Sequence, residues 1–135
     1  MRRTYTETFQ IEIERDLQTD QVITKTCRDE NGKLHGGVNM PAIIEYDPVS
    51  GKPVKLERWF HGRRHGLHVP AVEVIDPDTD VIIGEEWFDS GNRHRIDGPA
   101  YIVRDAKTGA VRRTENYVHE HGDQSIPKAP PPKPT

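Results

Sequence analysis

One phrase recurs along this chain at intervals of about 29 residues, and this recurrence limits the possible folds more than any other feature. Residues 61–72 read HGRRHGLHVPAV, and residues 90–101 read SGNRHRIDGPAY. A catalytic site is normally needed once, whereas a phrase written several times is typical of a building unit that stacks on its own copies. Five sets of residues follow the interval to within one residue: His35, His65 and His94; the Pro-Ala pairs that begin at Pro41, Pro70 and Pro99; Asp47, Asp76 and Asp105; Glu57, Glu85 and Glu115; and Trp59, Trp87 and Tyr117.

Each unit has the composition of a β-hairpin. A short run of β-favouring residues follows each Pro-Ala pair, as in IIEY, VEVI and YIVR, and a second run leads to the aromatic residue. The segments DPVSG, DPDTD and DAKTG between the two runs are rich in residues that favour chain reversal. No stretch shows the period of an amphipathic helix. The sequence therefore predicts an all-β protein, an antiparallel meander of about eight strands in roughly four hairpin repeats.

The first repeat, residues 9–32, is a degenerate copy in which LQTD supplies the turn. We place Cys27 in the position of the aromatic residue, because it lies five residues before Gly32. Terminal repeats are often atypical because they cap the stack. The repeats together form one predicted domain, residues 1–123.

The chain is lean in apolar residues, and this limits the thickness of the fold. Hydrophobic residues make up 33% of the sequence, and adding the 11 glycines brings the share to only about 41%, below the usual value of roughly 45–50%. Such a chain can cover one face of a sheet well, but it cannot fill a thick core. We therefore expect an elongated, twisted sheet of a single layer.

A longer motif, W-x(2–3)-G-x-x-H-R-x-D-G-P-A, runs through the repeats. Its best copy is WFDSGNRHRIDGPA at residues 87–100, and looser copies are WFHGRRHGLHVPA from Trp59 and NGKLHGGVNMPA from Asn31. Over residues 31–122 this pattern resembles the MORN repeat family and its variants in bacterial and phage proteins, which include antitoxin-like repeat proteins. The resemblance implies a twisted single-layer antiparallel sheet with a scaffold or binding role and no catalysis.

Charge, cysteine content and motifs argue against several classes of function. The net charge is −3 with acids and bases intermixed, so the chain lacks the basic excess expected of a nucleic-acid-binding protein. Cys27 is the single cysteine and can form no internal disulfide, and the N-terminal MRRTYTETFQ has no apolar run for a signal peptide or membrane span. We therefore expect a cytoplasmic protein that binds neither nucleic acid nor membrane. Without a Gly-rich phosphate loop, a nucleophile elbow or a Cys-His motif, we expect no cofactor and no small-molecule substrate.

The histidines and glutamates invite a catalytic or metal-binding interpretation. His61, His65 and His68 fall within eight residues, and zinc needs three or four converging ligands. His65 also belongs to a column with His35 and His94, so its expected role is to hydrogen-bond the turn between units. The glutamate column lies two residues before the aromatic column and so on the same strand face, where we expect pairing with Arg or Lys. A metal site in the histidine cluster stays an alternative.

The aromatic column and the nearby arginines form the candidate partner-binding surface. A lean single layer cannot bury every large aromatic side chain, and Trp, Tyr and Arg are enriched in interface hot spots. The predicted contact residues are Trp59, Arg63, Arg64, Trp87, Arg93, Arg95 and Tyr117.

The function predicted from these features is that of a noncatalytic module that binds a protein partner and blocks it. An antitoxin, an immunity protein or a phage-encoded inhibitor of a host system would act in this way. The oligomeric state is left open, with a homodimer among the options. A peripheral membrane or lipid scaffold of MORN type and a metal-dependent enzyme that uses the histidine cluster are the two alternatives.

The C-terminal segment 124–135 is predicted to be a disordered, polyproline-II-like tail, because its five prolines remove ladder donors and prevent strand pairing. Deletion of this segment should therefore leave the melting temperature almost unchanged in a thermal unfolding experiment. A loss of several degrees would mean that the segment docks on the sheet.

Overall fold

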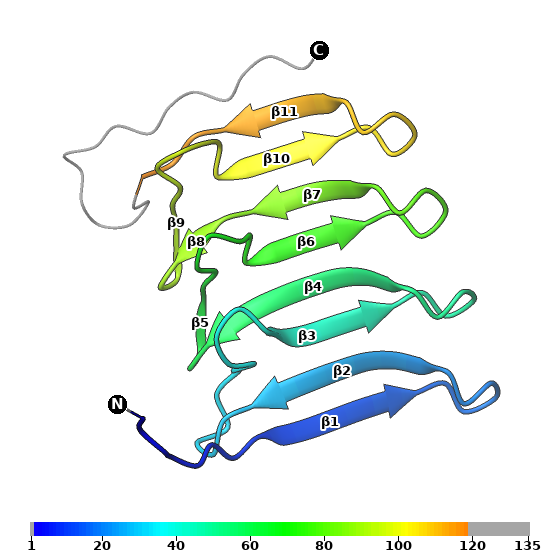
Figure 1. Cartoon of the computed structure of the whole chain (residues 1–135). Coiled ribbons are helices and arrows are strands. Elements are labelled where there is room, and N and C mark those ends of the chain that lie inside the picture. The colour runs from blue at the N-terminus through cyan, green and yellow to red at the C-terminus, as the bar shows by residue number, and fades with distance from the viewer. Residues whose placement is uncertain (1, 119–135) are drawn as a thin grey trace.

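Four β-hairpins lie side by side in a single layer (Figure 1). This computed structural model describes residues 2–118, so the tail predicted at 124–135 lies outside the described residues. Within the described range no helix occurs, and every strand pairing is antiparallel, so the predicted all-β meander is confirmed. The hairpins are β1 (Gln10–Arg15) with β2 (Val22–Arg28), β3 (Pro41–Tyr46) with β4 (Pro53–Phe60), β6 (Val72–Ile75) with β7 (Ile82–Glu86), and β10 (Tyr101–Arg104) with β11 (Val111–Glu115).

Short two-residue strands mark the turns between hairpins. β5 (Arg63–Arg64) pairs with the end of β4, and β8 (Phe88–Asp89) pairs with β9 (Asn92–Arg93). The chain therefore reverses twice in each unit, once at the tip of the hairpin and once at the opposite end of the strands. The main sheet follows the order β1-β2-β3-β4-β6-β7-β10-β11, as expected for a meander.

Every hairpin tip is closed by an Asp-led turn of one design. At the second tip, the Asp47 carboxylate accepts the Ser50 N–H at 2.7 Å, and its carbonyl accepts the N–H of Gly51, whose φ is +76°. Asp16 makes the equivalent bonds in the LQTD turn, so the first hairpin is a true copy of the unit. The same arrangement recurs at Asp76 and Asp105.

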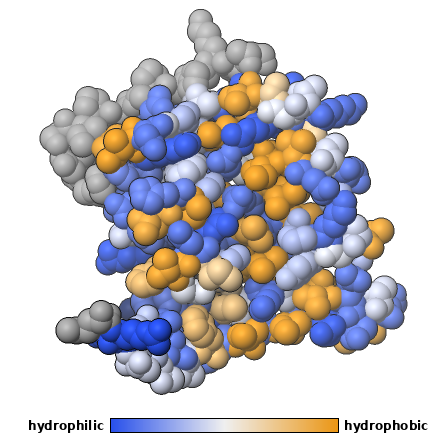
Figure 2. Space-filling view, in the orientation of Figure 1, coloured by the Kyte–Doolittle hydropathy of each residue, from blue (hydrophilic) through white to orange (hydrophobic). Residues whose placement is uncertain are grey.

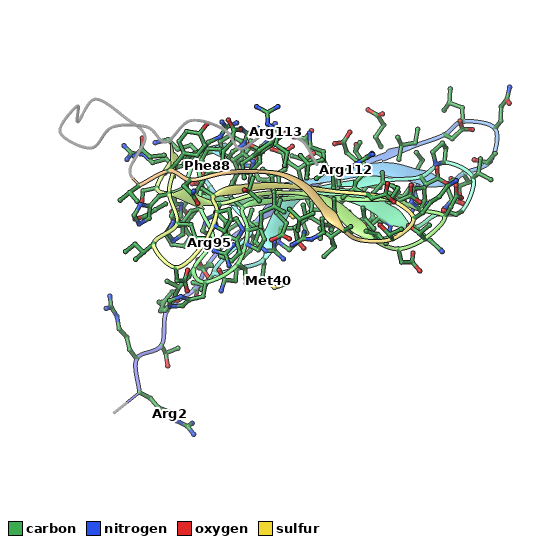
Figure 3. All side chains as sticks on the ribbon, turned by 90° about the horizontal axis from the view of Figure 1, so that it is seen from above. Arg2, Met40, Phe88, Arg95, Arg112 and Arg113 are labelled. Atoms are coloured by element: carbon green, nitrogen blue, oxygen red, sulfur yellow. The ribbon has the colours of Figure 1, made fainter. Side chains whose placement is uncertain are left out.

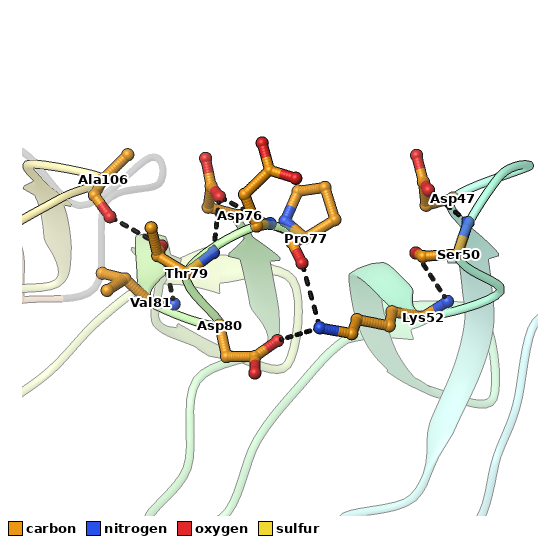
Figure 4. Close-up of polar contacts among 10 residues, drawn as sticks. Asp47, Ser50, Lys52, Asp76, Pro77, Thr79, Asp80, Val81 and Ala106 are labelled. Carbon is orange, nitrogen blue, oxygen red and sulfur yellow. Dashed lines mark hydrogen bonds and ion pairs between the residues drawn. The ribbon is translucent and has the colours of Figure 1, made fainter.

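Successive tips are also tied to one another (Figure 4). Lys52 donates to the carbonyl of Pro77 at 3.1 Å and to the carboxylate of Asp80 at 3.3 Å, and Thr79 donates to the carbonyl of Ala106 at 2.6 Å. These bonds join one unit to the next along the rim of the sheet.

Strand register defines two faces with different chemistry. One continuous row across the sheet contains Glu57, Glu86 and Glu115, separated by Val72 and Tyr101, and we call the face that carries it the ladder face. Because side chains alternate along a strand, residues next to this row point to the opposite side, which we call the loop face. Viewed along the layer, Phe88 and Arg113 project to one side and Arg95 and Met40 to the other (Figure 3).

The register corrects two of the predicted columns by one residue. Glu86, not Glu85, shares the row of Glu57, and Glu85 lies in the adjacent row on the loop face. Trp59 pairs with Arg64 as Phe88 pairs with Arg93, so Phe88 is the structural equivalent of Trp59.

The error arose because the letters WF occur in both units although their distances from the Asp turn differ by one residue. Trp87 instead takes the place of Arg58, since their carbonyls accept the N–H groups of His94 and His65. Cys27 also occupies this place, because it accepts the N–H of His35, so its assignment to the position of Trp59 and Tyr117 was wrong.

The interior is thin and partly polar, as the composition predicted. The alanines of the Pro-Ala pairs are fully buried, and Ala71 bonds through its N–H to Glu86 and through its carbonyl to Arg58. The buried set contains both apolar and ionisable residues: Ala42, Ala71, Val72, Ala100, Ile102, Tyr117, Asp29, His35, Glu57 and Glu115.

The Asp turns predict how stability depends on pH. Backbone N–H groups donated by Thr19, Ser50 and Thr108 lower the pKa values of their respective turn aspartates below the ordinary 3.8. A folded-state pKa below the unfolded value stabilises the fold above the unfolded pKa, and this contribution is lost as the pH falls through the folded value. The turn aspartates concerned are Asp16, Asp47 and Asp105.

We therefore expect the urea midpoint of the wild type to fall as the pH is lowered from about 5 to 3. Replacing the three turn aspartates by asparagine keeps an acceptor oxygen but removes the charge, so the decline should become shallower. Glu14→Gln, at an exposed position of β1, is the control and should follow the wild type. Parallel curves for all three proteins would contradict the prediction.

Candidate functional site

Alternating aromatic and arginine side chains cross the ladder face. The guanidinium of Arg64 lies 5.1 Å from the ring centre of Trp59 and 5.5 Å from that of Phe88. Arg93 lies 5.4 Å from the ring of Tyr117, which is only 3% exposed. Contacts of this kind are worth about 0.5–1 kcal/mol each at exposed sites. The structure thus brings four predicted contact residues together, but it packs them against one another.

Glutamates of the ladder face are held by fixed partners. Glu57 accepts a hydrogen bond from Trp59 Nε1 at 3.2 Å and pairs with Arg64 at 3.2 Å. Glu86 pairs with Arg93 at 3.2 Å; burial alone would lower the pKa of Arg93, but interactions led by the Glu86 carboxylate outweigh it and raise that pKa. The expected pairing of glutamates with arginine is therefore found, and the carboxylates are engaged in structural bonds.

The remaining predicted contact residues lie elsewhere. Trp87 is on the loop face, where its Nε1 donates to Glu85 and the guanidinium of Arg95 covers its ring at 3.8 Å. Arg63 is exposed at the turn between units, with its stem beside Gly91. The structure therefore divides the predicted surface between two faces.

A column of exposed aliphatic residues was missed from the sequence. Val38, Leu67 and Ile96 follow one another at intervals of 29 residues, and 67%, 51% and 82% of their surfaces are exposed. We call these three residues the aliphatic column. Each lies on the loop that leads into the next Pro-Ala pair. The regular spacing could have revealed the column. Because the three positions carry different residue types, a search for identical repeated residues does not detect them.

The first two loops that carry the aliphatic column are held to each other by hydrogen bonds. Asn39 clamps the next loop with two bonds, accepting the N–H of Leu67 at 2.8 Å and donating to its carbonyl at 2.9 Å. Gly66 permits a tight path, since a Cβ atom there would lie 2.1 Å from the carbonyl oxygen of Val69. The spacing between the first two members of the column is therefore fixed in the free protein.

A hollow of about 450 Å³ opens between the second and third loops. The residues that line it include Leu67, His68, Trp87, Arg95 and Ile96. Apolar surface appears in a series along the connecting-loop side of the molecule, interrupted by polar groups (Figure 2). The hollow and the aliphatic column together form a surface that combines exposed aliphatic side chains with the ring of Trp87 and the guanidinium of Arg95. We call it the docking surface.

The histidine column has the structural role predicted for it at both positions where the bond is seen. Nδ1 of His35 accepts the backbone N–H of His61 at 3.1 Å, and Nδ1 of His65 accepts that of Ser90 at 3.1 Å. These bonds tie the turn of one unit to the imidazole of the unit before it. His61 also bonds the buried Asp29 at 2.7 Å, and this hydrogen bond is the main cause of the lowered pKa of the Asp29 carboxyl.

The histidine cluster that was the alternative metal site, His61 with His65 and His68, is not assembled. Within residues 2–118, the side chains that could share a metal ion are Glu7, His35 and His61, whose ligand atoms lie within 4.8 Å of one another; His65 and His68 are not in this group. Nδ1 of His35 accepts an N–H, so Nε2 carries the ring proton and faces Glu7 at 3.4 Å. Metal binding at Nε2 would move that proton to Nδ1, directly against the N–H of His61. This tautomer weighs against a metal site.

The comparisons with known proteins add no relative. No family model, curated protein or solved structure matches the chain. Among the described residues, no helix is long and apolar enough to cross a membrane.

The ladder face generates a stability prediction. Arg93→Glu would place a second carboxylate beside Glu86 and remove the cation between aromatic rings, so it should cost about 1–3 kcal/mol of unfolding free energy. Arg63→Glu, at an exposed position in the preceding unit, makes the same charge change and should stay within about 0.5 kcal/mol of the wild type. Urea titrations measure both values. Equal losses for the two variants would show that the ladder contacts do not stabilise the fold.

Proposed function

We propose that this protein is a noncatalytic binding module that attaches to another protein through the docking surface and blocks it. An antitoxin, an immunity protein or a phage-encoded inhibitor would act in this way. The observation that carries the proposal is the aliphatic column, which places three exposed apolar side chains at one structural position of successive units. Single exposed apolar residues are ordinary, but a regular series beside a hollow is not explained by chance exposure.

The composition of the hollow supports a protein partner. Trp, Tyr and Arg are enriched in interface hot spots, and Trp87 and Arg95 both line the hollow. Burial of the aliphatic column by a partner would contribute roughly 25 cal/mol for each Å² of apolar surface covered.

The arginines of the sheet favour a protein partner over a nucleic acid. Arg58 pairs with Glu73, and Arg104 pairs with Glu85. With a net charge of −3, and with these guanidinium groups bonded to carboxylates, the chain has no basic excess with which to contact phosphates.

Two other functions are alternatives. Aliphatic loop tips can also enter the interface of a bilayer, so a peripheral lipid scaffold of MORN type is the second candidate. The exposed Asp97 beside Ile96 opposes contact with an anionic membrane. The metal-dependent enzyme is disfavoured by the tautomer of His35 and by the bonds that hold the glutamates.

The test uses a triple variant, Val38→Ser with Leu67→Ser and Ile96→Ser. All three side chains are exposed, so the melting temperature should stay near that of the wild type. The matched control is Leu17→Ser with Val49→Ser, which removes aliphatic groups that are 101% and 92% exposed at the hairpin tips.

Immobilised wild type and control should retain a common protein from the native cell, identified by mass spectrometry, and the triple variant should lose it. Retention of that protein by the folded triple variant would rule out the docking surface. Flotation of the wild type with liposomes, abolished in the triple variant, would favour the lipid scaffold instead.

A further inference from the structure

We propose that the partner contacts the docking surface with an amphipathic α-helix that lies across the strands and presents large apolar residues seven positions apart. This inference rests on the proposed function and adds the class of element that is recognised. It depends on the spacing of the aliphatic column, on the shape of the hollow, and on the charge beside it.

The spacing of the column matches two turns of a helix. Equivalent positions in neighbouring units are two strands apart, and strands lie about 4.8 Å apart, so the members of the column repeat at about 9.6 Å. Seven residues of an α-helix rise about 10.5 Å and return to nearly the same face. Over three units the two series stay in step to within about 2 Å.

Extended partners fit this surface less well. In a β-strand, side chains on one face repeat at about 6.8 Å or 13.6 Å, so no pair matches the interval. A polyproline-II segment repeats on one face at about 9.3 Å, which does match, but such segments dock on exposed aromatic faces. The guanidinium of Arg95 covers one face of the Trp87 ring at 3.8 Å, which reduces the aromatic surface open to a proline.

The free surface is already shaped for an inserted side chain. The Asn39 clamp closes the gap between the first and second loops, whereas the hollow of about 450 Å³ lies between the second and third. A leucine or phenylalanine from a helix would enter this hollow between Leu67 and Ile96. Pre-organised loops lose little entropy on binding.

Charge at the rim adds a second requirement on the helix. Asp97 follows Ile96, and its side chain is 86% exposed although Arg95 lies 3.5 Å away. A lysine or arginine on the helix next to the apolar stripe would complement this carboxylate. The same carboxylate disfavours an anionic bilayer as the occupant.

The experiment uses three synthetic peptides of about 20 residues, a length that spans three units as a helix. The first is an Ala/Glu/Lys helix with leucines seven apart, and the second has the same composition with leucines five apart. The third is a proline-rich peptide with leucine at every third position. Each is titrated into the ¹⁵N-labelled full chain, and amide shifts are followed by NMR.

We expect the first peptide to shift the amides of Val38, Leu67 and Ile96 and to bind at least tenfold more tightly than either of the others. The triple serine variant should lose at least tenfold of this affinity, and the Leu17→Ser/Val49→Ser control should keep it. Asp97→Lys should weaken binding of a peptide with lysines beside the leucines.

Equal binding of the second peptide would overturn the spacing argument, and tighter binding of the third would identify a polyproline-II partner. Failure of all three peptides would overturn the helix even if the triple serine variant loses its native partner, and in that case the proposed function stands. If the triple variant keeps its native partner, the proposed function fails regardless of the peptides. Binding to phosphatidylcholine vesicles with about one-fifth phosphatidylserine, but to no peptide, would assign the surface to a membrane.

Discussion

Ion pairs between glutamate and arginine cross a sheet whose interior is thin and partly polar. Glu57 with Arg64 and Glu86 with Arg93 repeat one contact in successive units, and aromatic rings lie on both sides of the arginines. Exposed ion pairs contribute little alone, but here the partners are partly buried. Glu57 also accepts a hydrogen bond from Trp59, and Arg93 lies against Tyr117. This arrangement explains how a chain with 33% hydrophobic residues can fold as a single layer.

The two ends of the hairpins are joined by different chemistry. At the tips, Lys52 and Thr79 reach the next turn, while at the other end His35 and His65 accept backbone N–H groups from it. The second hairpin is therefore bonded to the third at both ends, the first to the second at the histidine end, and the third to the fourth at the tips. The loops of the docking surface lie next to the histidine end, so this rigid seam supports the exposed aliphatic column.

Much of the fold could be predicted because the repeated units of one chain can be compared with one another. The Asp turns, the hairpins and the histidine bonds follow from residues whose local chemistry is the same in each copy. The errors concern register, where one residue moves a side chain to the opposite face. Trp87 was aligned by its neighbours in the sequence, and only strand pairing showed that Phe88 takes the position of Trp59.

The aliphatic column shows what local patterns could not reveal, since exposure of Val38, Leu67 and Ile96 depends on how the loops pack. It also follows from a structure in which each hairpin contacts only its neighbours. Adding or removing one hairpin would add or remove one member of the aliphatic column and about 9.6 Å of the docking surface, without disturbing the remaining hairpins. Under the function proposed above, the number of repeats would set the length of the partner that is contacted, while the chemistry of each contact stays the same.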